Sequence, residues 1–381
     1  MRHGPFWLSA FRNAMPNERG GVESRFNLWS LNRDWNFLKE PGWAMLATDD
    51  QTTRAAIVTF GEAMLRYSVE PGERLSQADV LRIHPGGAEL NVGVGLANLG
   101  EPVRYVTALP DSPLGQRMWR FIAEQGVEVV GDLAAPGRMG IYYLEPGVPP
   151  RPGVVTYDRQ DSAFSRYPWS QFDWERVLEP GGVFLTTGIT AALSAEALEG
   201  VRRSLETAAR KGLLVVFDVN YRSKLWTPEE AREALVPLLK HVNLLFTSVS
   251  DATVILGAPE MDPEELPAWL ASRYELDGVT LVYTPEAPKE PIQWRAFAWY
   301  KGETASYDQP AGVVTVDRLG AGDAYAAGFL WSLRQGKSLA DAVRYGSAMM
   351  ALKNTIHGDF GPFGPEELEH ASAVRPAGVQ R

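Results

Sequence analysis

Short runs of apolar residues recur along the chain from residue 55 onward, and segments with a helical spacing of apolar positions separate them. Runs of this length, closed by glycine or polar residues, are typical of buried β-strands. The predicted strands are Ala55–Gly61, Val103–Ala108, Val183–Thr187, Leu213–Asp218 and Leu244–Thr247, and the clearest predicted helices are Ala195–Lys211 and Pro228–Lys240. Regular alternation of strand and helix favours a mainly parallel sheet covered by helices on both faces.

Two further segments, about residues 64–85 and 138–160, have a different pattern. In them, residues such as Ile141, Tyr143 and Val155 alternate with other positions and lie near Pro-Gly pairs. Alternation with a period of two indicates strands with one exposed face. We therefore expect a small β-lid attached to the α/β body.

Residues 1–54 lack this patterning. They contain four tryptophans but no clear strand or helix period. We interpret them as an extension of a domain that covers residues 55–372, and residues 373–381 as a frayed tail. Three interpretations of the extension stay open: a docking arm, a disordered segment, and a mis-called start with Met45 as the true one.

The composition excludes several classes of protein. With 37 Lys and Arg against 47 Asp and Glu, the formal net charge of the 381 residues is −10, which disfavours binding to nucleic acid or to anionic membranes. The chain has no cysteine, so disulfides, thiolate nucleophiles and cysteine-ligated metals are excluded. No apolar run approaches the roughly 18 residues of a membrane span. We expect a soluble, cytoplasmic protein whose partner is a small molecule.

The strongest local motif is Asp317–Asp323, Asp-Arg-Leu-Gly-Ala-Gly-Asp, which runs directly into a predicted helix. Gly320 and Gly322 let the backbone approach a ligand, and the first turn of the helix offers unpaired N–H groups to an anion. An Asp at such a place is suited to accept a proton from a hydroxyl that attacks a phosphate. Asp323 is therefore the candidate base, although an ordinary helix start with a dipole-compensating Asp is the alternative.

A second motif, Gly86–Asn91, places two glycines and an Asn at the start of another predicted helix. Such a backbone and amide suit a polyhydroxylated ligand. The dinucleotide fingerprint G-x-G-x-x-G is absent here, because Asn98 stands where its last glycine is required. A P-loop ending at Gly336–Ser338 is also excluded, because Trp331 replaces its first glycine.

Together, and in this order, the two motifs resemble the signatures of the ribokinase-like (PfkB) carbohydrate kinases. The resemblance runs from about Ile57 to about Leu368 and is nearest to the 2-keto-3-deoxygluconate kinases, through the segments Thr187–Thr190, Asp218–Arg222 and Thr355–Phe360. It implies a three-layer α/β/α fold with a small β-lid. It also implies transfer of the γ-phosphoryl group of ATP to the terminal hydroxyl of a sugar acid.

Site residues follow from the resemblance by position. Asp323 matches the catalytic base, and Gly320, Ala321 and Gly322 match the anion hole. The positions that match sugar-binding residues are Gly87, Asn91, Tyr142, Tyr157, Arg159, Arg222 and Asp317. Two arginines facing one small ligand are suited to a carboxylate, because guanidinium groups pair with it through two parallel hydrogen bonds.

On the nucleotide side, the resemblance implies ATP and Mg²⁺, with Asn220, Ser248, Thr284 and the glycines of the anion hole near the nucleotide and Asp251 near the metal. Two departures from the family occur here. Ser248 and Asp251 stand where an Asn-x-x-Glu motif is expected, and Thr284–Lys289 contains prolines in place of a glycine-containing loop. The nucleotide preference therefore stays open.

Alternative functions also stay open at this point. A fructokinase or another sugar or nucleoside kinase would use the same machinery. A sugar-binding regulator without catalysis could keep the fold, although the intact Asp323 and its glycines argue against it. The lid is a candidate surface for a homodimer.

Overall fold

The computed structural model describes residues 54–284, 291–309 and 312–373, so residues 1–53, residues 285–290 of the predicted nucleotide loop and residues 374–381 lie outside the described residues. Within the described ranges, nine strands form one sheet in the order β13-β12-β11-β10-β9-β8-β1-β4-β5. Their bounds are β1 Ile57–Phe60, β4 Val103–Pro110, β5 Glu128–Ala135, β8 Val183–Thr187, β9 Leu214–Asp218, β10 Leu244–Ser248, β11 Gly278–Tyr283, β12 Arg295–Tyr300 and β13 Glu303–Asp308.

Most neighbouring strands of this sheet are parallel. From β11 across to β5 every pairing is parallel, whereas β12 and β13 add an antiparallel edge. The predicted mainly parallel sheet is confirmed, and each of the five predicted strands is present. Because parallel strands share one direction, their carboxyl ends open on one edge of the sheet, where ligands of α/β folds bind.

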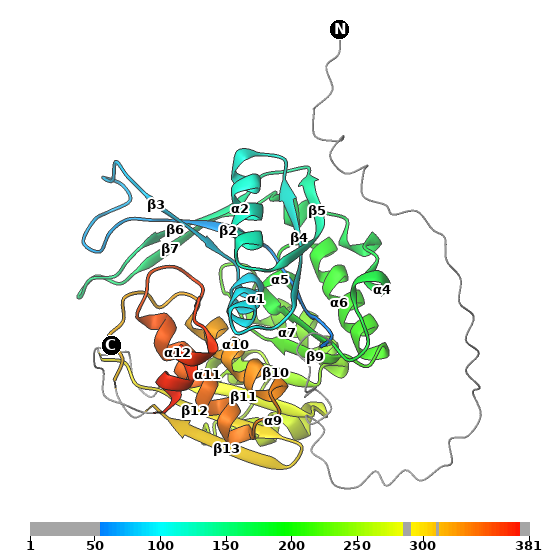
Figure 1. Ribbon diagram of the computed structural model, residues 1–381. Helices are drawn as coiled ribbons and strands as arrows, with labels where there is room; N and C mark the ends of the chain where they lie inside the picture. The colour runs from blue at the N-terminus through cyan, green and yellow to red at the C-terminus, as the bar shows by residue number, and fades with distance from the viewer. Residues whose placement is uncertain (1–53, 285–290, 310–311, 374–381) are drawn as a thin grey trace, which may run out of the picture. The chain divides into compact units, whose positions relative to one another are not determined.

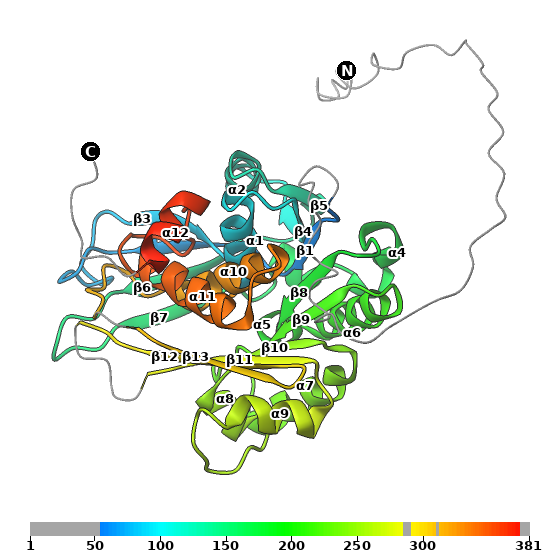
Figure 2. The same cartoon turned by 60° about the horizontal axis from the view of Figure 1, so that its bottom comes forward.

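Helices cover both faces of the sheet and make three layers (Figures 1 and 2). Adjacent residues of β1 show the division, because Ile57 packs into one apolar cluster and Val58 into the other. The helices on the Ile57 face are α1 Ala88–Asn98, α2 Pro113–Glu124, α10 Ala321–Arg334, α11 Leu339–Asn354 and α12 Pro365–Ser372. Those on the Val58 face are α3 Ala163–Arg166, α4 Trp174–Val177, α5 Gly188–Ala191, α6 Ala195–Arg210, α7 Pro228–Leu235, α8 Val249–Val254 and α9 Leu266–Tyr274.

One predicted helix is shorter than expected. The segment Pro228–Lys240 is α-helical as far as Leu235 and then continues as a 3₁₀ helix over Val236–His241. Pro237 explains the change, because proline has no N–H to donate and its ring clashes with the preceding turn of an α-helix. None of the helices in the described residues combines the length and the apolar character that a membrane span requires.

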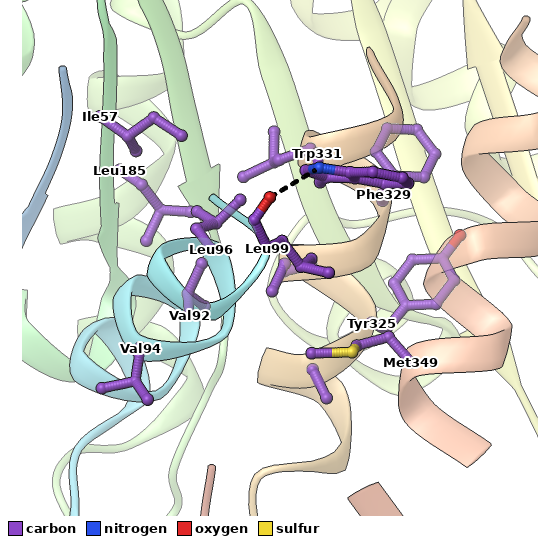
Figure 3. Packing of buried hydrophobic residues seen from close by; sticks show 14 of the residues in the cluster. Ile57, Val92, Val94, Leu96, Leu99, Leu185, Tyr325, Phe329, Trp331 and Met349 are labelled. Carbon is purple, nitrogen blue, oxygen red and sulfur yellow. Dashed lines mark hydrogen bonds between the residues drawn. The ribbon is translucent and has the colours of Figure 1, made fainter. Parts of the chain in front are cut away.

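The packing of α1 against α10 positions the two sequence motifs. Figure 3 shows Leu99, which directly follows α1, beside Trp331 and Phe329 of α10. The indole of Trp331 donates to the carbonyl oxygen of Leu99 at 3.1 Å.

Gly95 of α1 has no side chain, and this allows the two helices to approach closely. A Cβ at Gly95 would lie 2.8 Å from the Cβ of Ala327, so a larger residue would push the helices apart. The N-terminal ends of both helices therefore lie near each other.

Four more strands form a second sheet in the order β3-β2-β6-β7, seen at the upper left of Figure 1. They are β2 Met64–Ser68, β3 Arg82–Gly86, β6 Gly140–Glu145 and β7 Val154–Asp158. In β7 every second residue is exposed, as the period-two pattern predicts. This sheet is the expected lid.

Candidate active site

The Asp317–Asp323 motif forms a tight turn into α10. Gly320 caps the helix with a φ of 78°, and a Cβ there would lie 1.5 Å from the carbonyl oxygen of Asp359, so glycine is required. The N–H of Ala321 donates to Arg318 O at 3.2 Å. The N–H of Ala324 donates to Gly320 O at 2.9 Å. The N–H groups of Gly322 and Asp323 precede this first helical hydrogen bond and are the ones available to an anion.

Asp323 lies in that first turn, and Asn91 of α1 contacts it. The amide Nδ2 of Asn91 donates to Asp323 Oδ2 at 2.7 Å. Burial raises the pKa of Asp323 to about 7, and the nearby Glu89 carboxyl adds to the rise, while the Asn91 hydrogen bond and the charge of Arg222 oppose it. A carboxyl with a pKa near neutrality is suited to take a proton from a hydroxyl.

Asp323 lines a cavity between the lid and the body. Most of the predicted sugar-binding residues line this cavity, and the lining also includes acidic residues that the sequence analysis did not single out. The lining residues are Glu62, Met64, Gly87, Ala88, Glu89, Asn91, Tyr142, Val155, Tyr157, Arg159, Ile189, Arg222, Leu319, Gly320, Asp323 and Asp359. We call it the lid cavity.

The two predicted carboxylate-binding arginines both line the lid cavity, but their surroundings differ. Arg159 is paired with Glu62, through Nε at 2.8 Å and through Nη2, and both side chains are buried. Arg222 donates to the carbonyl oxygen of its neighbour Tyr221 at 3.0 Å in an exposed hydrogen bond. Arg222 therefore has more guanidinium N–H groups available to a ligand than Arg159 has.

Asp317 lies behind the lid cavity and not among its lining residues. Its Oδ2 is 2.6 Å from Nη2 of Arg66, a buried residue of β2, and also accepts the N–H of Gly358 at 3.1 Å. Its Oδ1 accepts the N–H of Leu319 at 3.1 Å. Both carboxylate oxygens therefore hold the protein together, and the role of Asp317 in substrate binding stays a prediction.

The same arginine joins the lid to the turn at Gly320. Nη1 of Arg66 lies 2.8 Å from Asp359 Oδ1, and the hydroxyl of Tyr142 in β6 donates to Asp359 Oδ2. Two lid strands thus reach residues on either side of the Gly320 turn. Buried ionic contacts thus join the lid to the turn at Gly320. Breaking such contacts is strongly destabilising.

A second cavity lies on the other side of α10, at the carboxyl ends of β9, β10 and β11. Asn220 and Ser248 line it as predicted, whereas Thr284 does not. The lining residues are Asp218, Asn220, Arg222, Phe246, Thr247, Ser248, Asp251, Thr280, Leu281, Val282, Gly322 and Tyr325. Arg222 lines both cavities, and the adjacent residues Gly322 and Asp323 line one each, so the two cavities meet at the start of α10.

Two carboxyl groups in this second cavity fit a magnesium ion. Burial raises the pKa of Asp251, and burial together with the charges of Asp323 and Asp251 raises the pKa of Asp218. A cation would relieve this repulsion. No cluster of three or more acidic or histidine side chains in the described ranges could hold a metal by itself, so an Mg²⁺ ion bound here would need phosphate or water oxygens besides these carboxylates.

Sequence reasoning missed four acidic residues that line the two cavities: Glu62, Glu89, Asp218 and Asp359. Glu89, Asp218 and Asp359 belong to segments that carry the resemblance to the kinase family, and Glu62 follows the glycine that closes the first predicted strand. Glu89 Oε1 accepts hydrogen bonds from the hydroxyls of Thr187 and Thr190, at 2.8 and 2.6 Å. The sequence did carry a sign of this role for Glu89, because it is an acidic residue in the first turn of a predicted helix whose other residues are mostly apolar.

The chain is similar to several known proteins. The chain is 36% identical over 328 residues to a 2-dehydro-3-deoxygalactonokinase of Haloferax volcanii, covering 86% of this chain and 99% of that one. It is 27% identical to a 2-dehydro-3-deoxygluconokinase of Bacillus subtilis, covering 79% and 90%. The crystal structure of a 2-dehydro-3-deoxygluconokinase from Thermotoga maritima matches with a TM-score of 0.76 and 31% identity, covering 84% and 98%. Residues 54–361 match the model of the pfkB family carbohydrate kinases, and the chain belongs to this family.

Proposed function

We propose that this protein transfers the γ-phosphoryl group of ATP to the terminal hydroxyl of a 2-keto-3-deoxy sugar acid. The observation that carries the proposal is the position of Asp323, a buried carboxyl with a pKa near 7 on the wall between the two cavities. The lid cavity has arginines suited to an acid, and the second cavity has carboxyls suited to a magnesium–nucleotide complex.

The transfer requires one proton acceptor and a site for negative charge. The terminal hydroxyl oxygen of the sugar bonds to the γ-phosphorus, the bond from that phosphorus to the β–γ bridging oxygen breaks, and ADP leaves. The hydroxyl proton passes to the carboxylate of Asp323. The free N–H groups at the start of α10 and the guanidinium of Arg222 face the developing charge on the phosphoryl oxygens.

Mg²⁺, when bound, neutralises charge on the phosphate oxygens during the transfer. Asp218 and Asp251 are the residues that would hold it, directly or through water. The change from the family's Glu to Asp251 shortens the side chain by one methylene, so a water-mediated contact suits it better.

The substrate class rests on the arginines and on the relatives. 2-Keto-3-deoxygluconate is our first candidate, and its C4 epimer 2-keto-3-deoxygalactonate is the second. The name of the Haloferax relative supports the epimer, and the names of the Bacillus and Thermotoga relatives support the gluconate. In those names, "dehydro" denotes the keto group.

A coupled assay of ADP release tests the proposal. The panel contains both keto-deoxy acids, gluconate, fructose, ribose and a nucleoside, each with ATP and Mg²⁺. We expect the highest kcat/KM on one or both keto-deoxy acids, and a kcat lower by about 10²-fold or more in the variant Asp323→Asn. A preference for fructose would replace the proposal with a fructokinase, and inactivity on the whole panel with intact sugar binding would support a regulator.

A further inference from the structure

Glu62 is a buried carboxylate with one oxygen in use and one without a partner. It follows β1, lines the lid cavity and is 4% exposed. Its Oε2 accepts from Arg159, whereas Oε1 has no hydrogen-bond partner in the described part of the chain. A buried carboxylate oxygen without a partner is costly, so the site is built to receive a donor.

Two glycines leave space for Glu62 at the wall of the lid cavity. A Cβ at Gly140 of β6 would lie 2.6 Å from Glu62 Oε1, so a larger residue would displace the carboxylate. A Cβ at Gly87 would lie 2.5 Å from the backbone carbonyl oxygen of Glu62. Gly140 therefore leaves room for the carboxylate of Glu62, and Gly87 leaves room for its backbone.

A second acceptor oxygen in the same cavity also has no hydrogen-bond partner among the described residues. Asn91 gives its Nδ2 to Asp323, and its Oδ1 is buried with no partner among the residues that the structure describes. Glu62 and Asn91 thus present two acceptor oxygens to one ligand. A ligand that satisfies both must carry hydroxyl groups that donate.

The chemistry of a sugar acid decides which of its groups can lie at Glu62. Its carboxylate and ketone oxygens accept hydrogen bonds, so only its hydroxyls can donate to Oε1. A carboxylate at that place would also be repelled by the charge of Glu62. Since Oε2 already pairs with Arg159, the acid end of the substrate is better placed toward Arg222.

We propose that Glu62 is a specificity-determining residue: its Oε1 accepts a hydrogen bond from a non-reacting hydroxyl of the substrate while its Oε2 orients Arg159. This inference rests on the proposed function and adds to it a residue that recognises the substrate hydroxyl at C4 or C5. It modifies the expectation that Arg159 and Arg222 both pair with the substrate carboxylate, because Arg159 already pairs with Glu62.

A cycle of variants and substrates tests the proposal. The variants are wild type, Glu62→Ala and Glu62→Gln, and the substrates are the preferred keto-deoxy acid and its analogues that lack the hydroxyl at C4 or at C5. In Glu62→Gln the amide oxygen remains available to Arg159, so this variant keeps the orienting role and replaces the acceptor Oε1 with an NH₂ group. Thermal unfolding of each variant checks that it is folded.

We expect wild type to prefer the full substrate to one of the two deoxy analogues by about 10²-fold or more in kcat/KM, because an analogue without the hydroxyl leaves a buried acceptor unpaired. Both variants should lower this preference at least about tenfold, with Glu62→Gln retaining the higher activity on the analogue. Equal losses on all substrates would show that Glu62 only supports the fold or Arg159 and would overturn the inference.

The proposed function is tested separately, by the activity of wild type on the keto-deoxy acids. If wild type instead phosphorylates a neutral sugar, the proposed function fails, and the same cycle is run with that sugar and its deoxy analogues. A preference for one hydroxyl that depends on Glu62 would then still support the inference, and its absence would overturn it. Arg138→Ala, which alters an exposed ion pair with Asp158 in the lid, serves as the control that should leave all preferences unchanged.

Discussion

The amide Nδ2 of Asn91 lies 2.7 Å from Asp323 Oδ2, and it joins the two motifs that are 232 positions apart in the sequence. The contact depends on the close packing of α1 and α10, where Gly95 meets Ala327 and the indole of Trp331 reaches Leu99 O. The hydrogen bond fixes the orientation of the carboxylate. It also stabilises the charged form, against the effect of burial.

Replacing Asp323 with Asn should lower kcat by about 10²-fold or more, the usual scale for losing a general base. The amide fits the same space but cannot accept the hydroxyl proton. Because the fold does not depend on the charge, the thermal midpoint and the binding of the sugar should stay close to wild type. Measured turnover near that of wild type would remove Asp323 from its role as base.

The pH dependence of kcat/KM should have an acidic limb near 7. Burial raises the pKa of Asp323 to about 7, and the carboxylate is the active form, so activity should be lost as pH falls through that value and reach a plateau above it. Rates measured between about pH 5.5 and 9 at saturating ATP and Mg²⁺ would locate the limb. The limb should be absent from the residual activity of Asp323→Asn.

The variant Asn91→Ala should move that limb to higher pH. Asn91 donates to the charged form of Asp323, so removing the donor destabilises the carboxylate and raises its pKa further. Activity at neutral pH should therefore fall more than activity at pH 9. A loss that is the same at every pH would indicate that Asn91 acts through the sugar alone.

The sequence was sufficient to predict the layers, the lid and the two motifs, because each depends on local pattern. The period of the apolar runs reports which faces are buried, and glycines before a helix report an anion site. The edge strand β13 and its neighbour β12 were missed. An edge strand has a partner on one side only and its pattern is weaker, as in β13, where exposed positions dominate.

Pairings between distant residues could not be read from the sequence. Arg66 of the lid contacts both Asp317 and Asp359, more than 250 positions away, and these contacts hold Asp317 at the turn before α10. The pairing of Glu62 with Arg159 likewise joins two cavity residues that no local pattern connects. Such roles follow from tertiary packing, which a single sequence does not display.

Arg66→Ala should be strongly destabilising. It would leave the carboxylates of Asp317 and Asp359 buried without their cation, and breaking a buried ion pair in this way costs about 3–5 kcal/mol. Urea denaturation followed by tryptophan fluorescence would measure the change in the free energy of unfolding. The matched control is Arg104→Ala, since Arg104 pairs with the exposed residues Glu128 and Glu179 and should contribute less than about 1 kcal/mol.

Arg222→Ala should be the clearest test of the charge of the substrate. Arg222 lines both cavities and has N–H groups available, whereas Arg159→Ala would also leave Glu62 buried without its partner. For a sugar acid, removing the guanidinium leaves the substrate carboxylate without a cation, and the loss should be about 2–5 kcal/mol, or at least about 30-fold in kcat/KM.

Because Arg222 also faces the phosphoryl group, kcat should fall together with the rise in KM for the acid. Any activity on fructose should keep its KM and lose only kcat, since fructose has no carboxylate to pair. The ratio of kcat/KM for the two substrates, measured in wild type and in Arg222→Ala, separates the two effects. If the variant lowers both activities in equal proportion, Arg222 serves only the phosphoryl group, and the acid must be bound by other residues of the lid cavity.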